Sequence, residues 1–148
     1  MRQQTYSRCV RPAVAVTAKI HLLVHRVSGG RVGRRWRGGE IVLLSTTGRR
    51  SGRRRTTPLV CISDGSDIVV VASNGGSDRM PDWWLNLRDR PQAELEVRGN
   101  TLAVVAEQAQ GDANARLTER FCWAFPCFGQ YRSRTQREIP VVLLRPQA

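Results

Sequence analysis

Short apolar runs separated by turn residues dominate the chain from Ile41 to its end. Most of these runs are β-branched and almost continuously apolar, which is typical of strands that are buried on both faces or close a barrel. One run, 93–97, alternates apolar and polar residues as a half-buried strand does. The pattern predicts six strands, at residues 41–46, 59–62, 68–72, 93–97, 101–107 and 139–144.

The connections between these strands are short and rich in turn residues. Residues 63–67 (SDGSD) are typical of a hairpin turn. Gly99 followed by Asn100 predicts a two-residue type II′ turn, because glycine stands at the position that needs a positive φ. Strands joined mostly by hairpins indicate a small barrel rather than a βαβ sheet.

Two helical segments interrupt the strands. Residues 81–89 (PDWWLNLRD) begin with Pro81, which suits a first helical turn, and Pro91 prevents this helix from continuing. A second helix is expected over about residues 112–123, where Asp112 can cap the first turn. The predicted fold class is therefore mainly β with short helices (α+β), built on a barrel of about six strands.

The first thirty residues follow a helical pattern instead. Apolar residues recur there at the spacing of one helix face, at Val16, Ile20, Leu23 and Val27. We expect a helical extension over residues 1–30 and one barrel domain over 31–148. The extension either packs on the core or contacts an anionic membrane surface. No run reaches the roughly 20 apolar residues that span a bilayer, so we expect a cytoplasmic chain, with peripheral membrane association as the alternative.

The charge of the chain narrows the choice of ligand. The chain has 148 residues and a net charge of +12, which favours polyanionic partners such as nucleic acid, anionic lipid or a phosphorylated ligand. Almost all of this charge is arginine, since Lys19 is the only lysine. The four cysteines form no paired C-x-x-C motif and the two histidines lie far from Cys122 and Cys127. We therefore expect no metal site and free thiols.

No familiar catalytic set of side chains is present. The chain has no H-E-x-x-H motif, no Ser-His-Asp set and no close pair of carboxylates. Its two histidines, His21 and His25, both lie in the N-terminal segment, and no G-x-G-x-x-G or Walker loop is present. If the protein is an enzyme, a cofactor therefore carries the reaction. The positive charge favours an anionic cofactor.

Residues 46–59 (TTGRRSGRRRTTPL) concentrate positive charge on a predicted turn between two strands. Five arginines fall within residues 49–55, and arginine binds phosphate and carboxylate groups in a bidentate way. Gly48 and Gly52 allow backbone angles that other residues avoid, so that amides and the Ser51 hydroxyl can face an oxyanion. A nucleic-acid site is the alternative, although no aromatic residues for base stacking adjoin the turn.

Three motifs in order carry a resemblance to a known family. They are TTGRRSGRRRTTPL, VVVASNGGSDRMPDWWLNL at 69–87 and FPCFGQYRSRTQREIPVVLL at 125–144. Together they resemble the deazaflavin-dependent nitroreductase family over roughly residues 30–145. The resemblance implies a split β-barrel, similar to the flavin-reductase and pyridoxamine-oxidase group, and coenzyme F420 as cofactor. It also implies hydride transfer between the reduced deazaflavin and a small, electrophilic, apolar substrate, such as a nitro compound, a quinone or an activated alkene.

The resemblance assigns cofactor-binding residues. Arg50 and Arg55 are expected to bind the phosphate and the glutamate tail of F420, and Arg54 to point to water. Asn74 stands where some relatives have lysine, which removes a positive charge near the ring. The expected cofactor-binding residues are Arg49, Arg50, Ser51, Arg53, Arg55, Thr57, Pro58, Ala72, Ser73, Asn74, Gly75, Gly76, Trp83 and Asn86.

The third motif is expected to shape the substrate side. The expected substrate-pocket residues are Trp84, Phe125, Phe128 and Tyr131, and the catalytic candidates are Tyr131 and Ser73. Relatives that reduce nitroimidazoles or quinones have tyrosines at the three aromatic positions of this motif, so two hydroxyls are missing here. The alternatives to an F420-dependent enzyme are an FMN-binding split barrel and a basic nucleic-acid-binding module. The expected partner is a small molecule, and the chain is a monomer or a homodimer.

Overall fold

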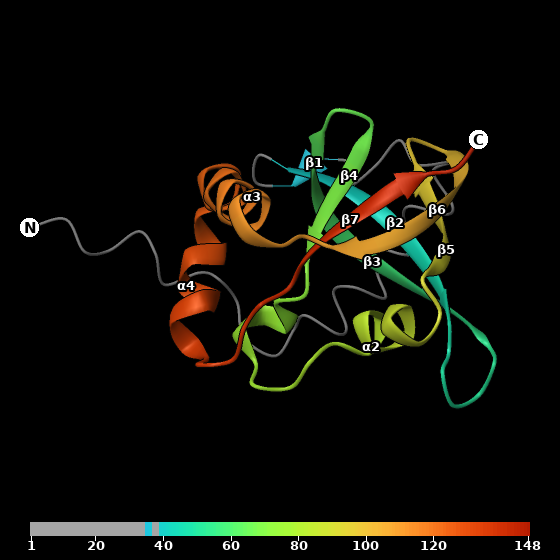
Figure 1. Cartoon of the computed structure of the whole chain (residues 1–148), viewed down its shortest axis with the longest axis horizontal. Coiled ribbons are helices and arrows are strands. Elements are labelled where there is room, and N and C mark those ends of the chain that lie inside the picture. The colour runs from blue at the N-terminus through green and yellow to red at the C-terminus, as the bar shows by residue number, and fades with distance from the viewer. Residues whose placement is uncertain (1–34, 37–38) are drawn as a thin grey trace, which may run out of the picture.

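A computed structural model describes residues 35–36 and 39–148 of the chain (Figure 1). The helix expected within residues 1–30 lies outside this part. The described strands are β1 (Arg35–Trp36), β2 (Gly39–Thr47), β3 (Arg54–Asp64), β4 (Asp67–Val71), β5 (Gln92–Val97), β6 (Asn100–Gln108) and β7 (Val141–Pro146). The described helices are the 3-10 helix η1 (Asn74–Gly76) and the α-helices α2 (Asp82–Asp89), α3 (Gly111–Ala124) and α4 (Pro126–Arg134).

The antiparallel strands close into a barrel. Neighbouring strands follow the order β1-β2-β3-β4-β7-β6-β5, and β5 pairs back with β2. Closure takes place where Leu43, Leu44 and Ser45 of β2 face residues 94–96 of β5. Strands β2 to β7 therefore form a six-stranded barrel, and the predicted fold class, a barrel of about six strands with short helices, is confirmed.

All six predicted strands are present, but β3 is longer than predicted. It begins at Arg54 rather than near Leu59, because residues 54–58 pair with residues 43–47 of β2. The basic turn is consequently short, and the Gly48 amide donates to the Arg53 carbonyl at 2.8 Å. Pairing with β2 therefore extends β3 into residues 54–58. These residues are mostly arginine and threonine, so the apolar pattern of a strand is absent from this part of the sequence.

The turn between β5 and β6 differs from the prediction by one position. Val97 pairs with Asn100, so Arg98 and Gly99 are the two turn residues. Both have positive φ, 52° and 82° respectively, which is the pattern of a type I′ turn rather than the expected type II′ turn. Asn100 belongs to the strand ladder, because the register follows cross-strand pairing and not the position of glycine alone.

Helix α2 closes one side of the barrel core. Trp83, Trp84 and Leu87 pack in one cluster with inward-facing strand residues such as Leu44 and Leu95. Figure 1 shows α2 beside the strands on the side opposite the β3–β4 hairpin. The helix begins after Pro81 and ends before Pro91, as predicted, although Pro81 is its N-cap rather than its first residue.

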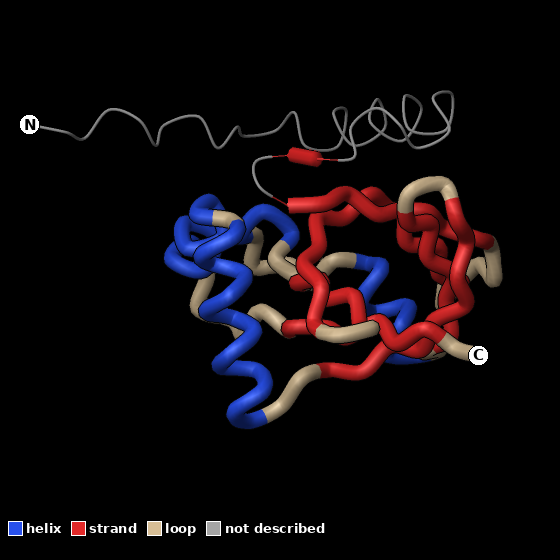
Figure 2. Tube along the Cα trace, turned by 90° about the horizontal axis from the view of Figure 1, so that it is seen from above, coloured by secondary structure: helices blue, strands red, loops and turns tan. Residues whose placement is uncertain are grey.

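Helices α3 and α4 cover the outer face of the barrel at one end (Figures 1 and 2). Leu117 of α3 packs with Val69 and Leu143, which are strand residues. Beside them, Phe121 of α3 and Phe128 of α4 form an aromatic cluster. The adjacent strand residues in β4 and β7 face the barrel interior instead, so the nearly continuous apolar runs are indeed buried on both faces.

Three local expectations need correction. Helix α3 begins at Gly111 with Gln110 as its N-cap, so Asp112 lies in the first turn and does not cap it. Helix α4 was not predicted, because its few apolar residues give a weak helical pattern. Cys61 and Cys122 are free thiols as expected, but Cys127 is disulfide-bonded.

In the part that the structure describes, no helix is both long and apolar enough to cross a bilayer.

Candidate functional site

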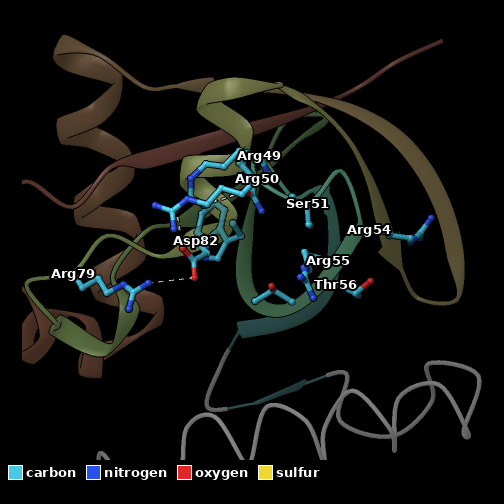
Figure 3. Close-up of a pocket in the computed structure, with 12 residues that line it drawn as sticks. Arg49, Arg50, Ser51, Arg54, Arg55, Thr56, Arg79 and Asp82 are labelled. Atoms are coloured by element: carbon cyan, nitrogen blue, oxygen red, sulfur yellow. Dashed lines mark hydrogen bonds and ion pairs between the residues drawn. The ribbon is translucent and has the colours of Figure 1, made fainter.

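A pocket of about 670 Å³ lies between the basic turn, β3 and α2 (Figure 3). Five arginines and one carboxylate line it, so its walls are strongly positive. Backbone pairing brings the arginines together from two separate segments, the β2–β3 hairpin and the loop before α2. The lining residues are Gly48, Arg49, Arg50, Ser51, Arg54, Arg55, Thr56, Thr57, Arg79, Asp82, Trp83 and Asn86.

Glycine is needed at two points of the basic turn. Gly52 has φ +69°, a conformation that strains other residues. A Cβ on Gly48 would lie 2.7 Å from the Ser51 hydroxyl oxygen, so this close turn leaves no room for a side chain. The Ser51 hydroxyl accepts a hydrogen bond from the Arg53 amide at 3.2 Å. The turn is therefore a compact structure that directs its arginine side chains outward.

Asn86 of α2 fastens this turn to the barrel. The Arg49 amide and Arg49 Nη1 both donate to Asn86 Oδ1, at 3.1 and 3.0 Å. Asn86 Nδ2 donates to Thr46 Oγ1 at 3.1 Å, and the Asn86 side chain is buried. Arg49 Nη2 also pairs with Asp82 at 3.2 Å. The side chains of Arg49 and Asn86 are therefore already hydrogen-bonded to one another at the base of the pocket.

The remaining arginines of the turn fall into two groups. Arg54 pairs with Glu94 of β5, and Figure 3 shows its side chain on the far side of the hairpin from Asp82. It is exposed, as expected, but it is an ion-pair partner. Arg50, Arg53 and Arg55 are exposed and make no side-chain hydrogen bond or ion pair with any residue in the described part of the chain. Of these three, Arg50 and Arg55 line the pocket and Arg53 does not.

The two tryptophans have different surroundings. Both are buried in the barrel core, with 6% of each exposed, and their rings meet edge to face at 6.4 Å. Trp83 also lines the basic pocket, whereas Trp84 does not. Trp83, which was expected to contact the cofactor, thus lines the pocket. Trp84, which was expected in the substrate pocket, is a core residue.

The glycine-rich segment contacts α4 and precedes Arg79, which lines the pocket. Asn74, Gly75 and Gly76 all have positive φ, and the Asn74 side chain donates to the Arg79 carbonyl at 3.0 Å. A Cβ on Gly76 would lie 2.8 Å from the Tyr131 carbonyl oxygen. Gly76 therefore serves close packing against α4, while Gly75 faces open space.

The expected site residues form three neighbouring groups rather than one. Arg49, Arg50, Ser51, Arg55, Thr57, Trp83 and Asn86 line the basic pocket. Ser73, Asn74, Gly75 and Gly76 belong to the loop that follows β4, while Ala72 is buried in the barrel core and Pro58 lies in β3. Phe125 and Phe128 are buried in the aromatic cluster, and Tyr131 is half-buried beside it.

Sequence reasoning missed Gly48, Arg54, Thr56, Arg79 and Asp82 as pocket residues. Thr56 and Arg79 lie within the motifs already singled out, and the proximity of Arg79 to Pro81 was an available signal. Asp82 pairs with Arg49 at 3.2 Å and with Arg79 at 3.7 Å. An acidic residue in the first turn of a helix is common, because it interacts favourably with the helix dipole. The sequence therefore explained Asp82 as a helix residue and did not indicate its ion pairs in the pocket.

Comparisons with known proteins identify the family of this chain. Residues 17–146 match the family model described as F420H(2)-dependent quinone reductase. An F420H(2)-dependent quinone reductase of Mycobacterium tuberculosis is 34% identical over 137 residues, covering 85% of this chain and 87% of that protein. The structure of an F420-H2 dependent reductase, FDR-A, is 29% identical with a TM-score of 0.66, covering 71% of this chain and 93% of that one. A structure described as a domain-swapped dimer is 26% identical with a TM-score of 0.69, covering 90% and 99%.

These matches confirm the resemblance that the three sequence motifs carry. They confirm the split-barrel fold, which the described strands also show, and F420 as the cofactor of the family. The family model spans residues 17–146 and therefore includes every expected site residue. The protein is an F420-dependent oxidoreductase that belongs to the F420H(2)-dependent quinone reductase family.

Proposed function

We propose that this protein binds F420 with the phosphate and glutamate tail in the basic pocket and reduces a quinone-type small molecule beside the glycine-rich loop. The observation that carries this proposal is the pair Arg50 and Arg55. Both line the 670 Å³ pocket, and neither has an ion-pair partner in the described residues. Unpaired guanidinium groups in a shared pocket are suited to a ligand with several anionic groups.

The donor set of the pocket fits the tail of F420. A phosphate and a run of carboxylates need several cationic donors spread along a groove, which Arg50, Arg55 and Arg79 provide from two segments. Arg49 contributes mainly by holding the turn, because its guanidinium already contacts Asn86 and Asp82. Trp83 offers an apolar wall between the charged tail and the barrel core.

The loop that follows β4 is the proposed position of the deazaflavin ring. Bound in its reduced form, F420 supplies a hydride to the acceptor. Gly75 leaves open space beside the loop backbone, and the Gly76 contact with the Tyr131 backbone brings α4 next to it. We assign Ser73 to a position beside the ring and the substrate, and the Tyr131 hydroxyl to donation of a hydrogen bond or proton to the reduced acceptor.

Burial separates Tyr131 from its aromatic neighbours. Phe125 and Phe128 are 7% and 2% exposed, and both pack against Phe121, with ring centroids 5.8 and 5.2 Å from it. Phe125 and Phe128 therefore hold α4 against α3. We assign direct substrate contact to Tyr131. The loss of two tyrosine hydroxyls leaves Tyr131 as the hydrogen-bond donor of this motif, and the assignment of a quinone-type acceptor rests on the family.

Assembly and location also stay predictions. The similar structure described as a domain-swapped dimer supports a homodimer over a monomer. A cytoplasmic location remains a prediction from the sequence. Membrane contact would involve residues 1–30, which lie outside the described residues.

The proposal is tested by titrating F420 into the purified full chain and following deazaflavin fluorescence. We expect saturable binding to the wild type and reduction of a soluble quinone by the reduced cofactor. Arg50→Glu and Arg55→Glu should each weaken F420 binding by about tenfold to a hundredfold, because each loses a charge-assisted hydrogen bond and adds repulsion.

Arg88→Glu is the matched control. Arg88 is exposed on α2, and it lies outside the basic pocket, so the same charge reversal should leave F420 affinity within about twofold. Equal affinity of wild type and Arg50→Glu would contradict the tail assignment. Tighter binding of FMN than of F420 would favour the flavin alternative, and salt-sensitive binding of duplex DNA alone would favour the nucleic-acid one.

A further inference from the structure

Arg137, between α4 and β7, holds an unusual position for an arginine. Its half-buried side chain contacts no carboxylate in the described residues and instead donates to backbone carbonyls. Arg137 Nη2 donates to the carbonyls of Ala72 and Ser73 at 3.1 and 3.0 Å. Arg137 Nε donates to the Ser77 carbonyl at 2.9 Å. One guanidinium therefore donates hydrogen bonds to the carbonyls of Ala72, Ser73 and Ser77 in the loop that follows β4.

This loop has few backbone hydrogen bonds of its own. The Gly76 and Ser77 amides bond to Ser73 and Asn74 within η1, and three residues in succession have positive φ. Such a conformation persists only where surrounding contacts maintain it. Ala72 is buried, and a buried carbonyl left without a donor destabilises the conformation that holds it. The guanidinium therefore stabilises the observed path of the loop backbone.

Other contacts from the same segment reinforce the arrangement. The Thr135 hydroxyl and an Asp78 carboxylate oxygen are 2.5 Å apart, and Arg134 Nη1 lies 3.4 Å from the Gly75 carbonyl. Arg137 Nη1 also lies 3.5 Å from Met80 Sδ. Three residues of the chain from the end of α4 to β7, Arg134, Thr135 and Arg137, thus contact the loop, although the two segments are about sixty positions apart.

We propose that Arg137 is a positioning residue that holds residues 72–80 in the conformation that receives the deazaflavin ring. The proposal rests on the proposed function, which places the ring beside this loop. Arg137 acts through the backbone of Ser73 and its neighbours and need not touch the cofactor. Because the same loop leads into Arg79 and α2, its position also sets one wall of the basic pocket.

The test compares the full-length wild type with Arg137→Gln, Arg137→Lys and Arg132→Gln. Arg132 is an exposed arginine of α4 whose Nη1 lies 3.8 Å from Cys122 Sγ, so its variant controls for loss of charge. Hydrogen exchange without cofactor is followed for residues 72–80 and for the barrel strands. F420 affinity, the fluorescence spectrum of bound F420 and the thermal midpoint are measured on the same samples.

We expect Arg137→Gln to speed amide exchange in residues 72–80 at least tenfold while β6 and β7 stay protected. F420 should bind about tenfold more weakly and with an altered emission spectrum, because a charge-assisted hydrogen bond corresponds to roughly this factor. Arg137→Lys should restore the charge but only part of the affinity, because a single ammonium lacks the planar fork of donors. Arg132→Gln should match the wild type.

The outcomes separate this inference from the proposed function. Unchanged exchange in residues 72–80 of Arg137→Gln overturns the inference even if the wild type binds F420 well. Faster exchange with wild-type affinity and emission also overturns it, since the loop would then not position the ring. Faster exchange throughout the barrel assigns Arg137 a general structural role instead. Failure of the wild type to bind F420 contradicts the proposed function, and the exchange measurement still shows whether Arg137 holds the loop.

Discussion

At the scale of single residues, identical side chains have different uses because their partners differ. Arg49 is held by Asn86 and Asp82, and Arg54 by Glu94. Arg50 and Arg55 have no such partner in the described chain. The sequence shows five neighbouring arginines and does not rank them by itself. The family resemblance favoured Arg50 and Arg55. In the folded chain, ion pairs distinguish Arg49 and Arg54 from these two residues, and the pocket lining distinguishes Arg53.

Cys61 provides a prediction at this scale. Burial in the barrel core, with a further contribution from Glu40, raises the pKa of the Cys61 thiol from 9.0 to about 12, and Arg98 opposes the shift. A folded pKa above the unfolded value means that the stabilisation is complete below pH 9.0 and is lost as pH rises toward 12. We expect the free energy of unfolding to fall by about 1.4 kcal/mol per pH unit across that window.

Urea unfolding at pH 8 and at pH 10.5 measures this effect, and Cys61→Ala is the control. The variant starts from a lower stability, because it leaves a small cavity, but its loss between the two pH values should be smaller than that of the wild type. Equal losses in both proteins would show that Cys61 does not titrate as described. In the native protein at pH 8, Cys61 should also react with iodoacetamide much more slowly than the half-buried Cys122.

At the scale of elements, local patterns located the strands and helices, whereas contacts between elements determined their ends. Strand β3 extends through Arg54 and Arg55 because β2 pairs with them. The β5–β6 turn uses Arg98 and Gly99 because the ladder places Asn100 opposite Val97. Helix α4 has a weak apolar pattern of its own and is held by its aromatic residues against α3. These differences all arise from contacts with a neighbouring element rather than from the pattern within one segment.

Two adjacent glycines allow a prediction about the contact between η1 and α4. Gly76→Ala should destabilise the protein by about 2–4 kcal/mol, because strain at positive φ is joined by a steric clash. Its added Cβ would lie 2.8 Å from the Tyr131 carbonyl oxygen, at φ +84°. Gly75→Ala has a similar φ of +65° but nothing within 4 Å, so only about 1 kcal/mol is expected from strain.

Denaturant unfolding of both variants measures the difference. Similar losses would show that the contact with α4 is unimportant and that only backbone strain matters. A larger loss for Gly76→Ala, accompanied by weaker F420 binding, is the outcome expected if α4 and the loop form one unit.

At the scale of the whole molecule, closure of the barrel creates the core on which the site depends. Leu44 of β2 pairs with Leu95 of β5, and both are completely buried. The core they form also contains Trp83, which lines the basic pocket. The position of the anion-binding wall therefore depends on strand pairing between segments about fifty residues apart.

Leu95→Ala tests this dependence. It should lower the free energy of unfolding by about 2–5 kcal/mol through lost burial and an unfilled cavity. Leu102→Ala is the control, because Leu102 faces Leu95 in the β5–β6 hairpin but is 37% exposed, and it should cost less than about 1 kcal/mol. Thermal and denaturant unfolding measure both, and equal losses would contradict the assignment of Leu95 to the closing core.

The sequence alone determined the approximate place of the six barrel strands, helix α2 and most of α3, the concentration of arginines on one turn, and the family. Apolar periodicity, proline positions and motif spacing are local properties, so they can be read without a fold. Only the tertiary structure decided which arginines are paired, that Trp83 rather than Trp84 lines the pocket, and that Arg137 contacts the loop after β4. The partners concerned lie roughly forty to sixty positions away, and no local pattern encodes contacts over such separations.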